Sequence, residues 1–327
     1  MKFAMYGSGA AGSVFASYMR KGGADIILID RYEEHMQKIA ADGMTFTIHL
    51  QEAGEYRDIT EVLPGFRTYT SAQAAFEAEG TVDAIIYMTK ATQLAAAIRD
   101  SLPVVGENTV AVSLINGLGN DDNLMKVYPA ERCVIGSGVL GTALKSPGHC
   151  VSTPAGGVQM NFGAIARSER TDAVCEEMLK CYRDGGCNAY WRKDDIYTYI
   201  WKKVIVNATV NTVCFVLRLK IGEIDKDPYG RELFHDVIRE ACAVATARGT
   251  PLDSEDFIAH DHRDIVTNIG DYYPSMCQDA FNRRMTEIDV LNGKIAEYGE
   301  ELGIPTPTCS VLSQCVRAIQ GNYDRQF

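Results

Sequence analysis

The chain opens with Met1-Lys2-Phe3-Ala4-Met5-Tyr6-Gly7-Ser8-Gly9-Ala10-Ala11-Gly12, and after one apolar-periodic segment it reaches Ala24-Asp25-Ile26-Ile27-Leu28-Ile29-Asp30. The order is an apolar strand, a G-x-G-x-x-G loop, a helix, a second apolar strand and an acidic residue, which is typical of a dinucleotide-binding βαβ unit. Gly7 permits the tight turn, Gly9 lets the backbone approach a pyrophosphate, and Gly12 lets the helix pack closely on the strand. The free N–H groups at the helix N-terminus then bind the anion. We therefore predict that residues 7–12, including Ser8, Ala10 and Ala11, hold a dinucleotide.

A second match to the same glycine pattern lies at residues 136–141. It follows an apolar run, but Lys145-Ser146-Pro147-Gly148 comes next, which is turn chemistry rather than a helix. We predict that this second match is a loop at the edge of a sheet.

The rest of the first half alternates between strand and helix patterns. Strands are expected over 82–88 and 109–115, with a helix over 92–101 between them. A further strand, for which an antiparallel direction is considered, is expected over 156–163, and a helix over 171–183. Ligands of open parallel sheets bind beyond the carboxyl ends of the strands. Lys90 and Asn116 follow two of the predicted strands, so we expect both to meet the cofactor.

Beyond residue 192 the pattern changes to long helical segments, at 196–217, 228–248, 254–267, 275–302 and 308–321. The predicted fold class is therefore α/β, with a Rossmann-type doubly wound sheet over residues 1–192. An all-α domain is expected to follow over residues 193–327.

Lys203, Asn207 and Asn211 stand at i, i+4 and i+8 in the first of these helical segments. On an α-helix they form one stripe with neighbours about 6 Å apart along the axis. On a strand each step would be about 13 Å, so only a helix lets adjacent members grip one small molecule. The alternative is a core segment whose asparagines bond to backbone and whose lysines reach solvent.

Bulk properties exclude several classes of function. The formal net charge of −11, with no Lys/Arg-rich stripe, argues against a nucleic-acid partner. No apolar run approaches the roughly 20 residues that span a bilayer, and no signal-peptide pattern is present, so we expect a cytoplasmic protein without a membrane partner. The ten cysteines form no C-x-x-C pair and do not cluster with the six histidines. Free thiols and no structural metal are expected.

Five segments in this order resemble the ketopantoate reductase (2-dehydropantoate 2-reductase) family. They are the first glycine loop, the strand end at Lys90, Asn116-Gly117-Leu118-Gly119, Trp201-Lys202-Lys203 with Asn207 and Asn211, and Ser275-Met276-x-x-Asp279 with Thr286-Glu287-Ile288-Asp289-x-x-Asn292-Gly293. The resemblance spans nearly the whole chain. It implies a Rossmann domain, a helical C-terminal domain, and an active site in the cleft between them.

The resemblance also implies a role for each matched residue. Lys203 would be the general acid, and Glu287 the carboxylate that closes the site near Lys203 and the nicotinamide ribose. Asn207, Asn211 and Ser275 would contact the substrate, and Asn116 would lie between substrate and cofactor. Lys90 would lie near the cofactor.

Two features depart from the family pattern, and a third leaves the choice between NADP and NAD open. Asp271-Tyr272-Tyr273-Pro274 precedes Ser275 where the family often carries an asparagine, and Arg218-Leu219-Lys220-Ile221 replaces another polar position. Both changes could reshape the pocket for the far end of the substrate. The cofactor is the third: family precedent and Arg31 favour NADP, whereas Asp30, placed to bind a ribose 2′-OH, favours NAD.

The expected function is NAD(P)H-dependent reduction of ketopantoate to (R)-pantoate in pantothenate and coenzyme A biosynthesis. The first alternative is a D-2-hydroxyacid dehydrogenase of the same family that acts on branched or aromatic 2-keto acids. The second is a nucleotide-binding sensor without turnover, which would have no need of a proton donor such as Lys203. The expected partner is a small 2-keto acid, and a homodimer is compatible with the sequence.

Overall fold

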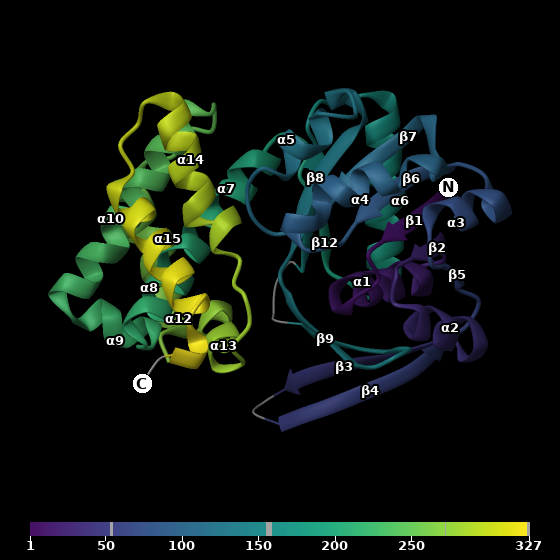
Figure 1. The fold of residues 1–327 in the computed structure, drawn as a ribbon, viewed down its shortest axis with the longest axis horizontal. Coiled ribbons are helices and arrows are strands. Elements are labelled where there is room, and N and C mark those ends of the chain that lie inside the picture. Colours follow the sequence, from purple (N-terminus) through teal and green to yellow (C-terminus); the bar gives the residue numbers. More distant parts are fainter. Residues whose placement is uncertain (53–54, 155–158, 272, 326–327) are drawn as a thin grey trace. The chain divides into compact units, whose positions relative to one another are not determined.

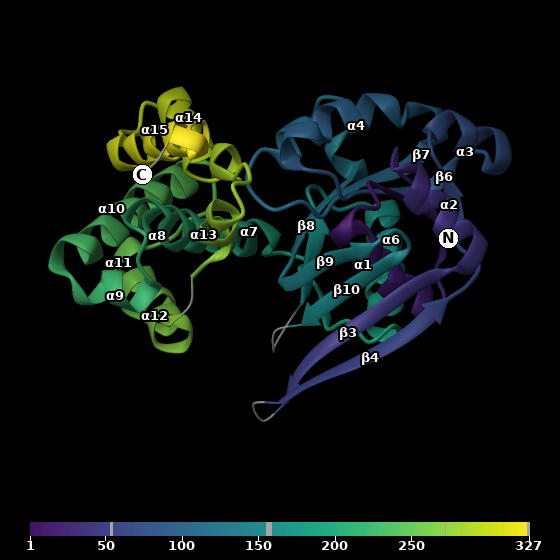
Figure 2. The ribbon, with the colours of Figure 1, turned by 60° about the horizontal axis from the view of Figure 1, so that its bottom comes forward.

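The computed structural model describes residues 1–52, 55–154, 159–271 and 273–325. The chain forms two compact units, shown as ribbons in Figures 1 and 2. The first unit comprises Met1–Asn116 and Asn120–Ile196, and the second comprises Gly117–Gly119 and Tyr197–Phe327. Leu118 belongs with the second unit because its N–H donates to the carbonyl of Val290 at 2.9 Å.

The first unit is built on an eight-stranded sheet with the order β12-β11-β8-β7-β6-β1-β2-β5. The strands from β5 to β8 in this order are all parallel, and β11 runs antiparallel to β8. This is the predicted doubly wound topology, and the antiparallel direction considered for the late strand is confirmed from residue 160 on. Residues 156–158 of that prediction lie outside the described part of the chain. The strands are β1 (Lys2–Tyr6), β2 (Asp25–Ile29), β5 (Arg67–Tyr69), β6 (Val82–Tyr87), β7 (Val105–Ser113), β8 (Cys133–Gly138), β11 (Met160–Ala164) and β12 (Ala189–Trp191).

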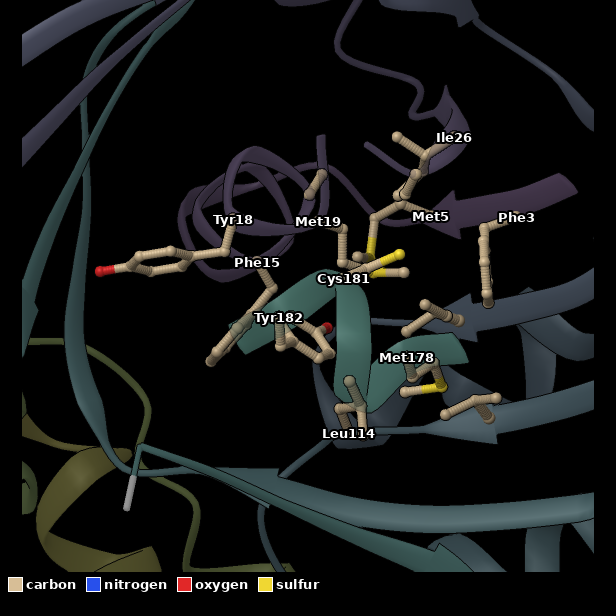
Figure 3. Packing of buried hydrophobic residues seen from close by; sticks show 14 of the residues in the cluster. Phe3, Met5, Phe15, Tyr18, Met19, Ile26, Leu114, Met178, Cys181 and Tyr182 are labelled. Carbon is tan, nitrogen blue, oxygen red and sulfur yellow. The ribbon is translucent and has the colours of Figure 1, made fainter. Parts of the chain in front are cut away.

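Helices α1 (Ala10–Lys21) and α6 (Glu169–Asp184) pack against each other over this sheet, and Figure 3 shows the side chains that they bury. Phe15 and Tyr182 meet edge to face with ring centroids 6.1 Å apart. Two glycines allow the close approach, since a Cβ on Gly22 or Gly185 would lie 1.9 Å from a carbonyl oxygen of the facing helix. The other α-helices described in the unit are α2 (Glu33–Asp42), α3 (Ala72–Glu79), α4 (Leu94–Asp100) and α5 (Asn120–Met125).

A second sheet of four strands, which the sequence analysis missed, has the order β4-β3-β10-β9. Its strands are β3 (Met44–Glu52), β4 (Glu55–Leu63), β9 (Leu140–Ser146) and β10 (His149–Pro154). Helix α1 contacts this sheet as well as the main one (Figure 2): the Tyr18 hydroxyl lies 2.9 Å from Ser152 Oγ, and its ring packs edge to face on Phe46.

The prediction that the second glycine match forms a loop at a sheet edge is wrong. Gly136 and Gly138 lie in β8, an interior strand, and Gly141 lies in β9. A Cβ on Gly136 would lie 2.4 Å from the carbonyl oxygen of Asn161, and one on Gly138 would lie 2.3 Å from the Phe15 ring. The prediction failed because glycine inside a strand can mark a close approach of neighbours rather than a turn.

All described elements of the second unit are helical, as predicted. They are α7 (Ile196–Val206), η4 (Asn207–Asn211), α8 (Thr212–Leu217), α9 (Ile221–Lys226), α10 (Pro228–Ala247), α11 (Ser254–Phe257), η5 (Ile258–His262), α12 (Arg263–Ile269), α13 (Ser275–Phe281), η6 (Ile288–Val290), α14 (Asn292–Leu302), α15 (Pro307–Gln320) and η7 (Tyr323–Arg325). The single helix predicted over 275–302 is wrong, since it is broken between Phe281 and Asn292. Arg283 adopts a left-handed φ of 52°, and the N–H and hydroxyl of Thr286 are bound by Gln320 on α15.

Elements α7, η4 and α8 form one continuous run, Ile196–Leu217, of 22 residues. By length and composition this run could cross a membrane, which corrects the expectation that no apolar stretch approaches that length. However, most of its apolar window is buried, and Val204, Ile205, Ala208 and Val213 belong to the hydrophobic core of the second unit.

Candidate active site

The glycine-rich loop has the geometry that a dinucleotide-binding turn requires. Gly7 adopts a φ of +95°, and a Cβ on Gly12 would lie 1.9 Å from the carbonyl oxygen of Gly7. Gly9 is exposed, caps the N-terminus of α1 without a side chain, and has no heavy atom within 4 Å of its Cβ position. The loop and helix are therefore packed tightly at Gly7 and Gly12, while the backbone at Gly9 is open to a ligand. These observations fit the predicted pyrophosphate site.

Asp30 follows β2 and lies against this loop. Its Oδ2 accepts the N–H of Ser8 at 2.6 Å, and its Oδ1 accepts the N–H of Tyr32 at 2.9 Å. The Ser8 side chain is buried, and within the described residues its Oγ has no hydrogen-bond partner. Arg31 is exposed next to Asp30. The carboxylate is thus held at the loop, where the ribose of a dinucleotide is expected.

His35 on α2 is connected to the glycine-rich loop through hydrogen bonds, a role that the sequence does not predict. It is fully buried and accepts the N–H of Gly148 on Nδ1 at 2.8 Å, so its Nε2 carries the proton toward Ser13 Oγ, 3.0 Å away. Ser13 Oγ in turn donates to the carbonyl of Ser8 at 2.7 Å. Burial lowers the pKa of His35, which keeps this chain of hydrogen bonds in its neutral form. A histidine inside a helix carries no sequence signal for such a role.

Lys90 and Asn116 follow β6 and β7, neighbouring parallel strands, at the carboxyl edge of the sheet. Lys90 is exposed, whereas Asn116 is half-buried. The Asn116 Oδ1 accepts a hydrogen bond from Ser137 Oγ at 2.6 Å. Ser137 is the second residue of the second glycine match, 136–141, and the sequence pattern predicts no function for it.

The structure distinguishes the two adjacent lysines on α7. Lys202 Nζ lies 3.1 and 2.9 Å from the two carboxylate oxygens of Asp261 on η5. For Lys203, burial lowers the pKa to about 8, and the charge of Glu287 acts in the opposite direction. Lys202 is therefore committed to an ion pair, whereas Lys203 can gain or lose a proton close to neutral pH.

Asn207 and Asn211 lie in η4, a π-helical turn, and not in the regular α-helix that the sequence predicts. On an α-helix, each four-residue step rotates about 40° past a full turn, so the stripe would drift around the helix. The wider π turn winds less per residue and reduces this drift, and such turns are frequent at functional sites. The Asn211 Nδ2 donates to Ser275 Oγ at 3.2 Å, so two of the predicted substrate contacts meet.

Asn292 supports this π turn, a role that the sequence pattern does not predict. It is fully buried, its Nδ2 donates to the carbonyl of Ala208 at 3.0 Å, and its Oδ1 accepts from Thr212 Oγ1. A buried amide that satisfies a backbone carbonyl and a hydroxyl stabilises a local departure from α-helical bonding.

The remaining reactive side chains do not form a second centre in the described part of the chain. There, no group of three or more His, Cys, Asp or Glu residues is placed to hold a metal ion. All ten cysteines are free thiols, and nine of them are buried. Burial raises the pKa of Cys277 to about 11, which makes it a poor nucleophile.

Comparison with protein families gives two matches that together span the chain. The model of the family Ketopantoate reductase PanE/ApbA matches residues 3–193. The model of the C-terminal part of the same family, Ketopantoate reductase PanE/ApbA C terminal, matches residues 195–320.

Individual relatives agree with this match. The 2-dehydropantoate 2-reductase of Streptococcus pyogenes serotype M3 is 31% identical over 313 residues, which cover 95% of each chain. That of Lactococcus lactis is 28% identical, with 97% of each chain covered. Among solved structures, D-mandelate dehydrogenase with NADH and anilino(oxo)acetate is similar, with a TM-score of 0.80, 29% identity and 100% of both chains covered.

Proposed function

The chain belongs to the ketopantoate reductase family, and we propose that it reduces 2-dehydropantoate to (R)-pantoate, a step of pantothenate and coenzyme A biosynthesis. The observation that carries this proposal is Lys203, whose pKa burial lowers to about 8. A proton donor with a pKa near the working pH is what reduction of a carbonyl to an alcohol requires.

Lys203 acts as the general acid. The nicotinamide cofactor supplies a hydride to the 2-keto carbon, and negative charge then develops on the keto oxygen. The Lys203 ammonium stabilises this charge and donates its proton to the oxygen. Glu287 favours the protonated lysine, because a neighbouring negative charge stabilises the ammonium form.

Two asparagines on the same helical run as Lys203, and the serine that one of them contacts, bind the substrate. Asn207, Asn211 and Ser275 offer amide and hydroxyl groups that hydrogen-bond a carboxylate or hydroxyl without adding charge. The pair formed by Asn211 and Ser275 supports this assignment, since both belong to the predicted contacts and lie in hydrogen-bond contact. Asn116 contributes an amide that binds the substrate and the cofactor.

The cofactor that we propose is NADH. The glycine loop of residues 7–12 binds its pyrophosphate, and Lys90 lies near the bound cofactor. The Asp30 carboxylate, held by the N–H groups of Ser8 and Tyr32, accepts a ribose 2′-OH and repels a 2′-phosphate. Arg31 is the residue that would oppose this preference.

A second candidate function is that of a D-2-hydroxyacid dehydrogenase for aromatic or branched 2-keto acids. The similarity to D-mandelate dehydrogenase favours it. So does the segment before Ser275, where Tyr273 packs edge to face on Phe281 with ring centroids 5.4 Å apart. An aromatic pair beside α13 would suit an apolar substrate side chain better than a hydroxylated one.

Initial rates of NADH and NADPH oxidation with ketopantoate, 2-ketoisovalerate and benzoylformate decide between the two candidates. A kcat/KM for ketopantoate at least about tenfold above the others, equal to about 1.4 kcal/mol of transition-state preference, supports the pantothenate role. A faster reaction with benzoylformate assigns the dehydrogenase function instead. No turnover with any of them would favour a nucleotide-binding sensor.

The cellular setting follows from the proposed role. We place the enzyme in the cytoplasm, where reducing conditions keep thiols such as its ten cysteines free. A homodimer stays a prediction, which the molecular mass in solution would test.

A further inference from the structure

The first three residues of the second glycine match, Gly136-Ser137-Gly138, have no dinucleotide role, yet they end the interior strand β8 at the carboxyl edge of the main sheet. Strand β8 lies between β7 and β11, and Ser137 pairs in register with Asn161 of β11. The serine is 2% exposed. A buried hydroxyl at the edge where ligands of such sheets bind needs an explanation.

The two flanking glycines show how tightly this strand end is packed. A Cβ on Gly136 would lie 2.8 Å from both Leu114 Cδ2 and Phe162 Cβ, and a Cβ on Gly138 would meet the Phe15 ring. Neither position can carry a side chain without moving its neighbours. Ser137 is therefore the residue of this triplet that can present a functional group, and its backbone is held in place on both sides.

The Ser137 hydroxyl forms a hydrogen bond with the side chain of Asn116. Its Oγ donates to the Asn116 Oδ1 at 2.6 Å, a short contact between a strand end of β8 and the segment that follows β7. A side-chain amide can otherwise turn over and exchange its oxygen with its nitrogen. With the oxygen bound by Ser137, the N–H donors of the amide point to its other side.

This orientation matters for the substrate class of the proposed function. The keto oxygen and the carboxylate of a 2-keto acid only accept hydrogen bonds, so an amide that binds them must present its nitrogen. We propose that Ser137 is a positioning residue, which fixes the Asn116 amide in the orientation that a 2-keto acid requires. This inference rests on the proposed function, and it assigns the second glycine motif a role outside nucleotide binding.

A double-mutant cycle tests the proposal, with kcat and KM measured for the 2-keto acid that the wild-type enzyme prefers. Ser137→Ala is expected to lower kcat/KM about tenfold, and Asn116→Ala to lower it further. If Ser137 acts through Asn116, the double variant is no worse than Asn116→Ala alone. Ser137→Thr, which keeps the hydroxyl, should recover part of the loss.

Ser113→Ala is the matched control. Ser113 ends the neighbouring strand β7, is 1% exposed, and within the described residues its Oγ has no hydrogen-bond partner. Its removal should leave kcat/KM within about twofold of the wild type. Melting temperatures of all variants show whether any loss comes from unfolding.

Two results would overturn the inference. The losses of Ser137→Ala and Asn116→Ala could multiply in the double variant, which would mean that the residues act independently. Alternatively, Ser137→Ala could match Ser113→Ala, which would mean that the hydroxyl has no role. Both results leave the proposed function standing, whereas a wild-type protein without turnover of any 2-keto acid would remove both proposals.

Discussion

Asn211 donates a hydrogen bond from Nδ2 to Ser275 Oγ at 3.2 Å, across 64 residues of sequence. The contact joins the π turn η4 to the first turn of α13. Asn211 is almost fully buried, whereas Ser275 is exposed. The buried amide is therefore hydrogen-bonded to a hydroxyl whose residue is exposed to solvent.

Ser275→Ala should raise the KM for the 2-keto acid at least about tenfold, because a lost hydrogen bond to a charged carboxylate costs about 1.5–3 kcal/mol. The affinity for the nucleotide should stay unchanged, since Ser275 is assigned to the substrate alone. Steady-state kinetics with each substrate varied in turn check both statements. An equal change in the two KM values would contradict the assignment.

Lys203→Ala should lower kcat at least about 100-fold, because general acid catalysis contributes that much or more. Nucleotide affinity, measured by fluorescence titration, should be retained. Lys202→Ala is the control on the same helix: it loses a partly exposed ion pair with Asp261, worth at most about 1 kcal/mol of stability, and should keep turnover. Unchanged turnover in Lys203→Ala would refute the mechanism.

The pH dependence follows from the lowered pKa of Lys203. Reduction needs the protonated lysine, so kcat/KM for the keto acid should fall as the pH rises through about 8. Oxidation of the hydroxy acid needs the neutral amine and should rise over the same range. Glu287→Gln removes a charge that raises this pKa, so the alkaline limb should move to lower pH. A limb that stays in place would show that Glu287 does not act on Lys203.

Two glycine variants separate folding from nucleotide binding. Gly9→Ala places its Cβ in open space and should fold normally, yet weaken nucleotide binding at least about tenfold, because the backbone can no longer approach the pyrophosphate. Gly12→Ala places a Cβ 1.9 Å from the Gly7 carbonyl oxygen and should lower the melting temperature as well. Equal nucleotide affinity in Gly9→Ala and the wild type would show that the loop does not bind the pyrophosphate.

Asp30→Asn should shift the preference from NADH toward NADPH by about tenfold. The amide oxygen can still accept the N–H of Ser8, but the charge that repels a 2′-phosphate is gone. Arg31→Ala is the complementary variant and should weaken NADPH alone. The ratio of kcat/KM for the two nucleotides checks both variants, and an unchanged ratio in Asp30→Asn would assign cofactor choice to other residues.

Short-range patterns were enough to predict two parts of this protein, the nucleotide-binding unit and the helical unit. The loop of Gly7, Gly9 and Gly12 between two apolar strands identified the Rossmann unit, because each glycine answers a local steric demand. The change from alternating to continuous helical patterns identified the second unit. The resemblance through Lys203, Asn207 and Asn211 identified the family, which two family models confirm.

The contacts of the site residues could not be predicted from the sequence, because their partners are distant in the chain. Lys202 pairs with Asp261, whereas burial lowers the pKa of Lys203 to about 8, and Asn292 supports the π turn across 84 residues. Ser137 reaches Asn116 only because β8 lies beside β7 in the sheet. Glycines in β8 and the break after Phe281 were misassigned for the same reason. Close packing and long-range hydrogen bonds overrode the local preference, and a single sequence does not display either.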